Sequence, residues 1–319
     1  MDQTLRIGFA GDVMLGRTLD HILDERGYWY PWGDVLPIMQ QTDLNIINLE
    51  TALTNSEDKV LKTFNFKAKP DKVESLVKAR ITVVNLANNH VLDYGESGLI
   101  ETLNTLKGAG IKYVGAGMNL EEAESPEFVE IKGIRVGVIG MTDNESTWKA
   151  GKGPGTNYLE IESEKDRAKV LQTIEKARRQ CDCLVVSIHW GPNMVESPPE
   201  EFVQFAHSMI DHGANIIHGH SAHIFQAVEQ YHGGLILYDT GDFVDDYVVD
   251  PLLRNDRSAF FEIYVGCSGV KKLEVIPVRI FDYQANKAIG EDYQWVMRRF
   301  QKSSSEFDTV LGEDGVLNF

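Results

Sequence analysis

The sequence predicts an α/β fold in which mixed sheets are flanked by helices. Apolar runs of strand length alternate with amphipathic segments of helix length along most of the 319 residues. No internal repeat and no low-complexity linker interrupts this alternation. The apolar fraction of 43% and the charged fraction of 25% are those of an ordinary globular protein. We therefore expect one α/β domain over residues 1–302, followed by a polar, loosely held tail over residues 303–319.

The first half of the chain contains three patterns of buried strands, each followed by polar residues. The runs are Leu5–Ala10, Leu44–Leu49 and Ile81–Ala87. They end at Gly11-Asp12, at Glu50 and at Asn88-Asn89-His90. A helix follows the third run, because Leu99, Leu103 and Leu106 recur at helical spacing and Gly108 suits a helix end.

The second half continues the alternation and then changes to an antiparallel pattern. Strands are expected at Ile134–Gly140, Cys183–Ile188, Ile216–Ile217 and Leu235–Tyr238. Helices are expected over Ser163–Gln180 and after Pro198-Pro199, the second ending at Gly213. Two alternating runs, Phe260–Val265 and Leu273–Ile280, predict antiparallel strands near the C-terminus.

The net charge of −17 argues against nucleic acid or an anionic membrane surface as a partner, since either would require basic clusters. It is compatible with a small anionic substrate, because a bound metal can reverse the local field. No apolar run reaches the roughly 18 residues of a membrane-spanning helix. No leader-like segment precedes Leu5, so we expect a cytoplasmic protein; the alternative is export through an N-terminal anchor outside this sequence.

The cysteines Cys181, Cys183 and Cys267 form an odd and sparse set. We expect them to be reduced and mostly buried, without a disulfide framework. Cys181-Asp182-Cys183 could belong to a soft metal site, but two thiols without a second pair are more often core residues.

Side chains able to bind metal or to move protons follow one predicted strand after another. They are Asp12, Glu50, Asn89, His90, His189, His220 and His223. In open α/β sheets, sites form in the crevice beyond the carboxyl ends of the strands. Carboxylate oxygen, amide oxygen and imidazole nitrogen suit a borderline divalent metal. The sequence therefore predicts a metal site at that edge.

Some of these residues have a structural interpretation, whereas others favour a bound cation. Asp12 can cap a helix after a strand-to-loop turn. Glu50 ends an apolar strand, where an unpaired carboxylate is costly to bury, so a cation partner is favoured. His220 and His223, three residues apart in a tight loop, can converge on adjacent metals. His218 is interpreted as a core residue or as a support for a metal ligand.

Asp93 has two interpretations that can hold together. With Glu96 three residues later, it resembles a capping box for a helix beginning near Tyr94. Three residues after His90, it can also orient that imidazole through a hydrogen bond.

A specific combination of segments extends over most of the chain. The segments are FAGDVMLGR (9–17), DLNIINLE (43–50), FNFKAKP (64–70), LANNHVLDYG (86–95), VGAGMN (114–119), SIHWG (187–191), GANIIHGHSAH (213–223) and LYDTGDF (237–243). In this order they resemble the CapA, or poly-γ-glutamate capsule-synthesis, family. The resemblance implies the fold of the calcineurin-like metallophosphatases, an α/β sandwich of mixed sheets flanked by helices.

The resemblance also implies roles for the residues at the strand ends. Asp12 and His223 would bind a first metal, and Glu50 would take the bridging place. The second metal would be bound by Asn89, His189 and His220, and His90 would be the catalytic imidazole. The implied cofactor is one or two divalent ions of Mn, Fe or Zn.

The chain departs from the related patterns at several positions. Met14 stands where the phosphatase pattern Asp-x-His has its histidine, and Glu50 replaces the usual bridging aspartate. Ser221-Ala222 stand where His-Pro is common in the CapA pattern, and Asp242 stands where Asn is common. The acidic stretch of Asp242, Asp245, Asp246 and Asp250 is either a solvated loop or part of a substrate or metal site.

The expected activity is metal-dependent hydrolysis, with a phosphoester as the favoured substrate class. His90 would protonate the leaving group, and Asp93 would fix its tautomer. Candidate substrate contacts are Arg17, Lys67, Lys69, Asn88 and Asp242. The alternatives are an amide hydrolase or transferase of a γ-glutamyl polymer, and a non-catalytic accessory protein of poly-γ-glutamate synthesis or export. The expected partner is a small anionic substrate or poly-γ-glutamate.

Overall fold

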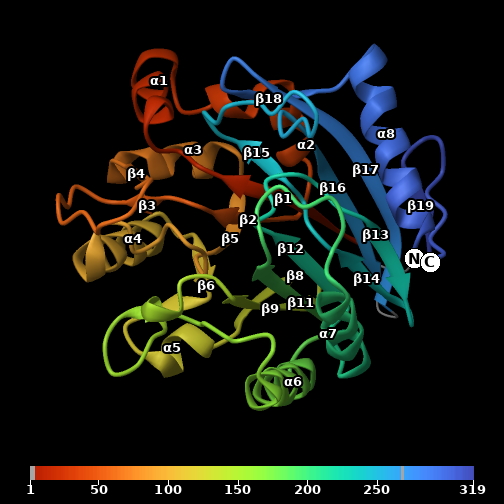
Figure 1. The fold of residues 1–319 in the computed structure, drawn as a ribbon, viewed down its shortest axis with the longest axis horizontal. Helices are drawn as coiled ribbons and strands as arrows, with labels where there is room; N and C mark the ends of the chain where they lie inside the picture. The colour runs from red at the N-terminus through yellow and green to blue at the C-terminus, as the bar shows by residue number, and fades with distance from the viewer. Residues whose placement is uncertain (1–3, 267–268) are drawn as a thin grey trace.

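Two mixed sheets pack face to face in the computed structural model, which describes residues 4–266 and 269–319 (Figure 1). The larger sheet has the order β18-β17-β16-β1-β2-β5-β6, with β15 beside β1 and β19 beside β17. Its strands are β1 (Leu5–Val13), β2 (Leu44–Leu49), β5 (Ile81–Asn85), β6 (Lys112–Val114), β15 (Asp242–Val244), β16 (Arg257–Gly266), β17 (Gly269–Phe281), β18 (Gln284–Lys287) and β19 (Val316–Asn318).

The smaller sheet has the order β13-β14-β12-β11-β9-β8. Its strands are β8 (Glu127–Ile131), β9 (Ile134–Thr142), β11 (Cys183–His189), β12 (Ile216–His220), β13 (Val228–Tyr231) and β14 (Gly234–Leu237). Two short pairs stand apart from the large sheets: β3 (Ala52–Leu53) with β4 (Lys67–Ala68), and β7 (Ala116–Gly117) with β10 (Gly155–Thr156).

Helices cover the outer faces of the sandwich (Figure 1). Near the larger sheet lie α1 (Thr18–Arg26), α2 (Leu36–Met39), α3 (Val73–Lys78) and α4 (Gly95–Gly108), with the 3-10 turns η1 (Tyr30–Val35) and η2 (Pro70–Lys72). Near the smaller sheet lie α5 (Leu120–Glu124), α6 (Glu164–Arg178) and α7 (Glu200–Asp211), whereas Trp148 of the 3-10 turn η3 (Ser146–Trp148) packs against the helix-side core of the larger sheet. The long helix α8 (Gly290–Ser305) packs against β13, β16 and β17. The expected α/β sandwich is confirmed.

The core has three layers because both faces of each sheet are covered. Alternate residues of one strand therefore serve different layers: Val185 packs between the sheets, whereas Val186 packs under the helices of the smaller sheet. On the larger sheet, Ile46 faces the other sheet and Ile47 faces the helices. Strands buried on both sides read as continuous apolar runs, which is the pattern that the sequence shows at β2 and β11.

The expectation of a loosely held tail over residues 303–319 is wrong. Helix α8 continues to Ser305, and the Oγ of Ser304 accepts a hydrogen bond from the backbone of Val228. Leu311 and Leu317 are buried in the layer between the sheets, and β19 pairs with β17. These few apolar side chains are enough to hold a segment whose composition is otherwise polar.

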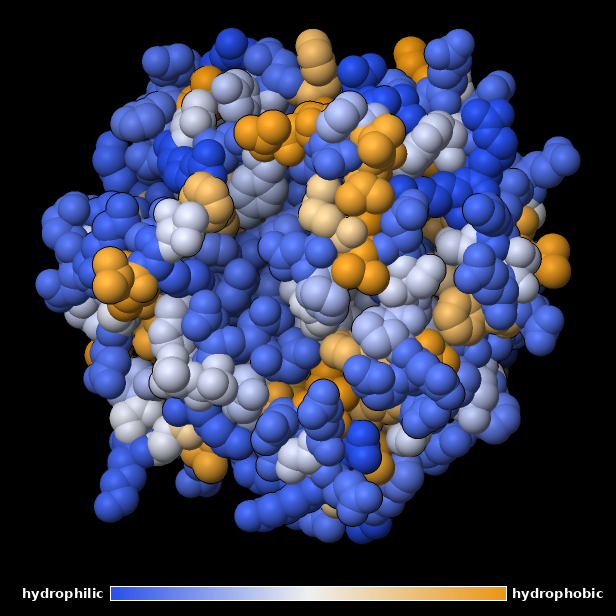
Figure 2. Space-filling model, in the orientation of Figure 1, coloured by the Kyte–Doolittle hydropathy of each residue, from blue (hydrophilic) through white to orange (hydrophobic). Residues whose placement is uncertain are grey.

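Cys181 and Cys183 are buried free thiols, as predicted, and Cys267 lies outside the described residues. In the described part of the chain, no helix combines the length and apolar character needed to cross a membrane. The face shown in Figure 2 is largely hydrophilic, with hydrophobic side chains in small separate groups.

Candidate metal centre

The predicted ligand residues come from both sheets and meet at the carboxyl ends of their strands. Asp12 lies near the end of β1, and Glu50 directly follows the neighbouring parallel strand β2. His189 and His220 end β11 and β12 and are paired in register. His220 Nδ1 lies 3.9 Å from Asp12 Oδ1, so the two sheets contribute to one site.

Two groups of three side chains, among the residues described, place their ligand atoms within 4.8 Å of one another. One group is Asp12, His189 and His220, and the other is Asp12, Glu50 and His223. Asp12 belongs to both groups, so it is placed to be shared by two ions. The Oε1 atom of Glu50 also lies 4.0 Å from His189 Nε2, so both carboxylates reach toward both groups.

Asp12 and Glu50 are buried, and each has one oxygen left for a cation. Asn48 Nδ2 donates to Asp12 Oδ1 over 2.7 Å, whereas Asp12 Oδ2 and Glu50 Oε1 have no hydrogen-bond partner within the described residues. Burial, partly opposed by the charge of His223, raises the pKa of Asp12 to about 7. Burial and the charge of Asp12 raise the pKa of Glu50 well above its ordinary value. Because unpaired buried carboxylates are costly, this set fits one or two divalent cations.

His189 and His220 add two neutral imidazoles to these carboxylates. Their Nδ1 atoms lie 3.0 Å apart, and His189 Nε2 lies 3.0 Å from Asn89 Oδ1. Burial is the main cause that lowers the pKa of both rings well below the ordinary value. The neutral ring is the form that binds metal, so these donors also fit a borderline divalent ion.

His218 lies beneath the site and reaches it through a serine. Its Nδ1 is 3.0 Å from Ser187 Oγ, and that same Oγ is 3.0 Å from His220 Nε2. Burial lowers the pKa of His218 to about 3. The position fits the interpretation of His218 as a support for a ligand.

His90 and Asp93 form a tight pair beside the ligand groups. His90 Nδ1 lies 2.6 Å from Asp93 Oδ2, and the ring stacks on Phe66 with centroids 3.8 Å apart. Its Nε2 atom points toward Glu50, 3.9 Å from Oε1. Burial, opposed by Asp93, lowers the pKa of His90 to about 4. One nitrogen is therefore held by Asp93, and the other faces the site.

Asp93 orients His90 and does not cap the following helix. Its carboxylate also accepts hydrogen bonds from the backbone of Phe66 at 2.6 Å and from Lys62 Nζ at 3.2 Å. Helix α4 begins at Gly95 after Tyr94, where no side-chain cap is present in the described structure. The capping interpretation is wrong because the carboxylate is already committed to these partners.

Asp242 lies inside the site as the partner of His223. Its Oδ1 is 2.8 Å from His223 Nδ1, and it is opposite Asp12 in the parallel pairing of β1 with β15. This pairing needs Gly11, because a Cβ there would meet the carbonyl oxygen of Gly241 at 1.8 Å. Burial disfavours charge on His223, but Asp242, Glu50 and Asp12 outweigh it and raise the pKa of His223 well above its ordinary value.

The first part of the acidic stretch is buried, so the interpretation as a solvated loop is wrong there. The Oδ1 atom of Asp245 accepts a hydrogen bond from the backbone of Tyr247, and an ion pair at 3.3 Å joins Asp246 to Arg17. The hydroxyl of Tyr247 donates to Glu50 Oε2 over 3.0 Å. Tyr247 was not among the predicted site residues, because a tyrosine in an acidic loop carries no ligand signal.

A cavity of about 570 Å³ lies in front of the ligand groups. Its lining includes His223 of the ligand groups, the neighbouring Asn89 and His90, three aromatic rings and two cationic side chains; the last five are Phe64, Phe66, Tyr247, Arg17 and Lys62. The cavity is large enough for a small organic substrate. Arg17 and Lys62 are the basic side chains among the described lining residues, and both also form ion pairs: Arg17 with Asp246, and Lys62 with Asp93 and Glu145.

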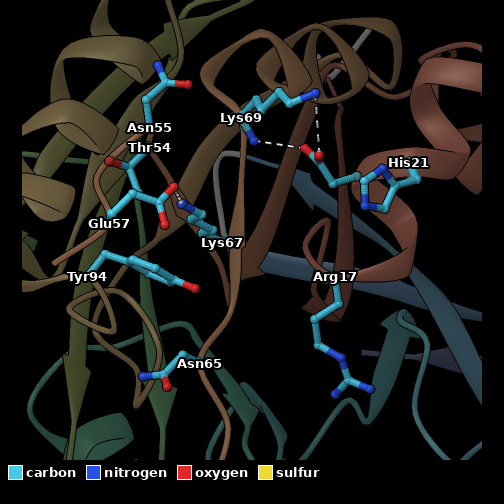
Figure 3. A pocket seen from close by; sticks show the side chains of 10 residues that line it. Arg17, His21, Thr54, Asn55, Glu57, Asn65, Lys67, Lys69 and Tyr94 are labelled. Atoms are coloured by element: carbon cyan, nitrogen blue, oxygen red, sulfur yellow. Dashed lines mark hydrogen bonds and ion pairs between the residues drawn. The ribbon is translucent and has the colours of Figure 1, made fainter. Parts of the chain in front are cut away.

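Lys67 lies in a neighbouring cavity of about 380 Å³, which shares Arg17 with the first (Figure 3). The ammonium of Lys67 is held by Glu57 at 2.6 Å and by the carbonyl of Ser56 at 2.8 Å. Lys69 lies in the same cavity and pairs with Asp24 at 3.2 Å. Of the predicted cationic contacts, only Arg17 therefore lines the cavity of the ligand groups.

Asn88 is buried and supports the turn that carries Asn89 and His90. Its amide nitrogen donates to the carbonyl of Leu49, and its Oδ1 accepts from the backbone nitrogens of His90 and Val91. These contacts occupy the amide, so the predicted role of Asn88 as a substrate contact is not supported.

Comparison with known proteins agrees with the segments that carry the resemblance. Residues 6–247 match the model of the family described as "Bacterial capsule synthesis protein PGA_cap". The chain belongs to this family. The match covers the site from Asp12 to Tyr247, so the ligand groups lie within the part of the chain that defines the family.

Curated relatives of the PGA_cap chain extend over most of its length. A "Probable polyglutamine synthesis accessory protein" of Mycobacterium tuberculosis is 32% identical over 93% of this chain and 90% of its own. The "Capsule biosynthesis protein CapA" of Bacillus anthracis is 29% identical over 96% of this chain and 75% of its own length. The "PGA biosynthesis protein CapA" of Bacillus subtilis is 29% identical over 100% and 83%. The resemblance to the CapA family is confirmed.

Proposed function

We propose that this PGA_cap protein is a metal-dependent hydrolase that acts on a phosphoester during synthesis of a capsule polymer. The observation that carries the proposal is the pair of ligand groups sharing Asp12, next to an imidazole held by a carboxylate. A structural metal site would require the ligands but would not require His90 and a cavity in front of them.

The metal would be held by Asp12, Glu50, Asn89, His189, His220 and His223. When bound, divalent ions in such a site polarise the substrate oxygen and make water a stronger nucleophile near neutral pH. Asp12 and Glu50 supply negative charge, and His189 and His220 supply neutral nitrogen donors.

The chain's own residues would bind the substrate and move a proton. Asp93 keeps a hydrogen on His90 Nδ1, which leaves Nε2 as the atom that exchanges a proton with the leaving group. Arg17 and Lys62 would face the anionic part of the substrate from the cavity wall. An anion in the cavity would favour the protonated form of His90 and oppose the effect of burial.

The second candidate is a non-catalytic accessory role, because the relative from Mycobacterium tuberculosis is described as a synthesis accessory protein. In this role the metal would stabilise a binding surface for the polymer or for its synthesis machinery. The third candidate, hydrolysis or transfer at a γ-glutamyl amide, has the capsule-synthesis names of the relatives in its favour.

Glu50→Gln separates the hydrolase from the accessory protein. Metal-reconstituted wild type is assayed against a panel of phosphoesters and γ-glutamyl peptides, with Glu57→Gln as the control at an exposed carboxylate. A hydrolase should lose turnover by orders of magnitude in Glu50→Gln and keep it in the control. No metal-stimulated hydrolysis by the wild type would favour the accessory role, and turnover only of γ-glutamyl peptides would favour the third candidate. Wild-type activity that survives Glu50→Gln would place the reaction elsewhere.

A further inference from the structure

A line of hydrogen-bonded side chains runs under the metal centre from the backbone of β1 to His220. The links are His218 Nε2 to the carbonyl of Ala10 at 3.1 Å, His218 Nδ1 to Ser187 Oγ at 3.0 Å, and Ser187 Oγ to His220 Nε2 at 3.0 Å. We propose that Ser187 and His218 are positioning residues that keep a hydrogen on His220 Nε2 and leave its Nδ1 as the ligand atom. The inference rests on the proposed function only in taking the centre as a metal site.

The hydrogen bond between His218 and the carbonyl of Ala10 fixes which groups donate and which accept along the line. The carbonyl oxygen of Ala10 can only accept a hydrogen bond. The second neighbour of His218 Nε2 is Thr240 Oγ1 at 3.4 Å, whose own hydrogen is committed to the carbonyl of Gly219 at 2.9 Å. Both neighbours are acceptors, so the hydrogen of His218 is on Nε2. Its Nδ1 therefore carries a lone pair.

Ser187 transmits these donor and acceptor roles from His218 to His220. Because His218 Nδ1 has no hydrogen to give, Ser187 donates its hydroxyl hydrogen to that atom. The lone pairs of the hydroxyl oxygen are then what faces His220 Nε2, so His220 must be the donor of the third hydrogen bond. Strand pairing holds the geometry, since Ser187 and His218 are opposite each other in the register of β11 and β12.

The result is a defined lone pair inside the ligand group. With its hydrogen on Nε2, neutral His220 has a bare Nδ1, which lies 3.0 Å from His189 Nδ1 and 3.9 Å from Asp12 Oδ1. The carbonyl that starts the line belongs to Ala10, two residues before Asp12 on the same strand. One strand of the larger sheet thus supplies a ligand directly and sets the protonated nitrogen of another ligand on the smaller sheet.

The first test uses nuclear magnetic resonance of metal-free wild type labelled with 15N-histidine. The chain has nine histidines, so long-range 1H–15N correlations can be resolved ring by ring, with His220→Gln identifying the relevant signals. The expected pattern for His220 is a protonated Nε2 and an unprotonated Nδ1. The reverse pattern overturns the proposal. This result is independent of hydrolytic activity, so failure of the proposed function leaves the test intact.

The second test compares two replacements of His218. In His218→Gln the amide can still donate to Ala10 and accept from Ser187, so the hydrogen of His220 should stay on Nε2. In His218→Leu the serine has His220 Nε2 as its remaining acceptor, so the hydrogen should move to Nδ1 and block the ligand atom. We expect Zn²⁺ affinity, measured by competition with a chelating dye, to fall about 10–100-fold in His218→Leu and to stay near wild type in His218→Gln.

Equal affinity and the same His220 tautomer in the two variants would overturn the proposal. Circular dichroism and thermal melting report whether each variant is folded. Should His218→Leu fail to fold, Ser187→Ala provides the same comparison, because it removes the acceptor for His220 Nε2–H. The wild-type spectrum remains decisive in either case.

Discussion

The hydroxyl of Tyr247 donates a hydrogen bond of 3.0 Å to Glu50 Oε2, across 197 positions of the chain. The bond occupies one oxygen of the carboxylate and leaves Oε1 directed at His90 and His189. Tyr247 also meets the ring of His223 edge to face, with centroids 5.3 Å apart. The tyrosine therefore holds together two ligand residues of one group.

Tyr247→Phe should weaken metal binding while the fold survives. Without the hydroxyl, Glu50 can rotate, and we expect about 10-fold lower metal affinity, within the range for residues that orient ligands. Removal of a hydrogen bond to a buried carboxylate should also lower the free energy of unfolding by about 1–3 kcal/mol. Tyr28→Phe is the control, because Tyr28 donates to the exposed carboxylate of Asp71. Equal metal affinity in both variants would contradict this role.

Protein purified without chelator should contain at least one Mn, Fe or Zn ion per chain by elemental analysis. His189→Ala and His220→Ala should each lower that content, whereas His207→Ala should not, because His207 pairs with Glu229 away from the centre. Added metal should raise the melting temperature of the wild type, since a ligand that binds the native state stabilises it. A wild type without affinity for any of the three metals would rule out the ligand assignment.

His90→Ala should keep its metal and lose about 10²–10⁴ in turnover, the usual size of a proton-transfer contribution. Asp93→Asn should retain more of the activity than His90→Ala, because the imidazole remains and only its orientation is weakened. Asp71→Asn serves as the control at a remote carboxylate. Loss of metal in His90→Ala would move His90 into the ligand set and leave the proton donor unassigned.

Cys183 should resist alkylation in the folded protein up to strongly alkaline pH. Burial raises its thiol pKa from the ordinary 9.0 to about 12, so the reactive thiolate is scarce. The unfolded chain releases this proton near pH 9 and the native chain does not, so the contribution to stability falls as pH rises from about 9 to 12. Labelling with iodoacetamide at pH 8, with and without urea, tests whether Cys183 resists alkylation in the folded protein. Rapid labelling of Cys183 without urea would contradict this prediction.

Residues at the ends of apolar strands could be found from the sequence because topology brings such ends together. Asp12, Glu50, His189 and His220 follow this rule, and the structure places them in the two ligand groups or within reach of both. Asn48 could not be found in this way, because it lies within β2, where a polar residue predicts only a defect in an apolar run. Its amide is nevertheless bonded to Asp12 Oδ1.

Side-chain pairing could not be predicted from composition. Lys67 carries the charge that an anion site would use, but its ammonium is bound by Glu57 (Figure 3) and also donates to the carbonyl of Ser56. Asp242 belongs to an acidic stretch that suggests solvent exposure, yet it is buried against His223. Each outcome depends on contacts between residues 10 to 19 positions apart, and a local pattern of charges does not predict such contacts.

Gly11 has no side chain that could bind a metal, yet the geometry of the centre depends on its being glycine. The carbonyl of Gly241 occupies the place of its missing Cβ, so a single added methyl group would push β15 away from β1. That displacement would carry Asp242 away from His223 and alter the site without touching any ligand. Gly11→Ala would thus alter the candidate metal centre, although Gly11 itself has no side-chain atom that could bind a metal.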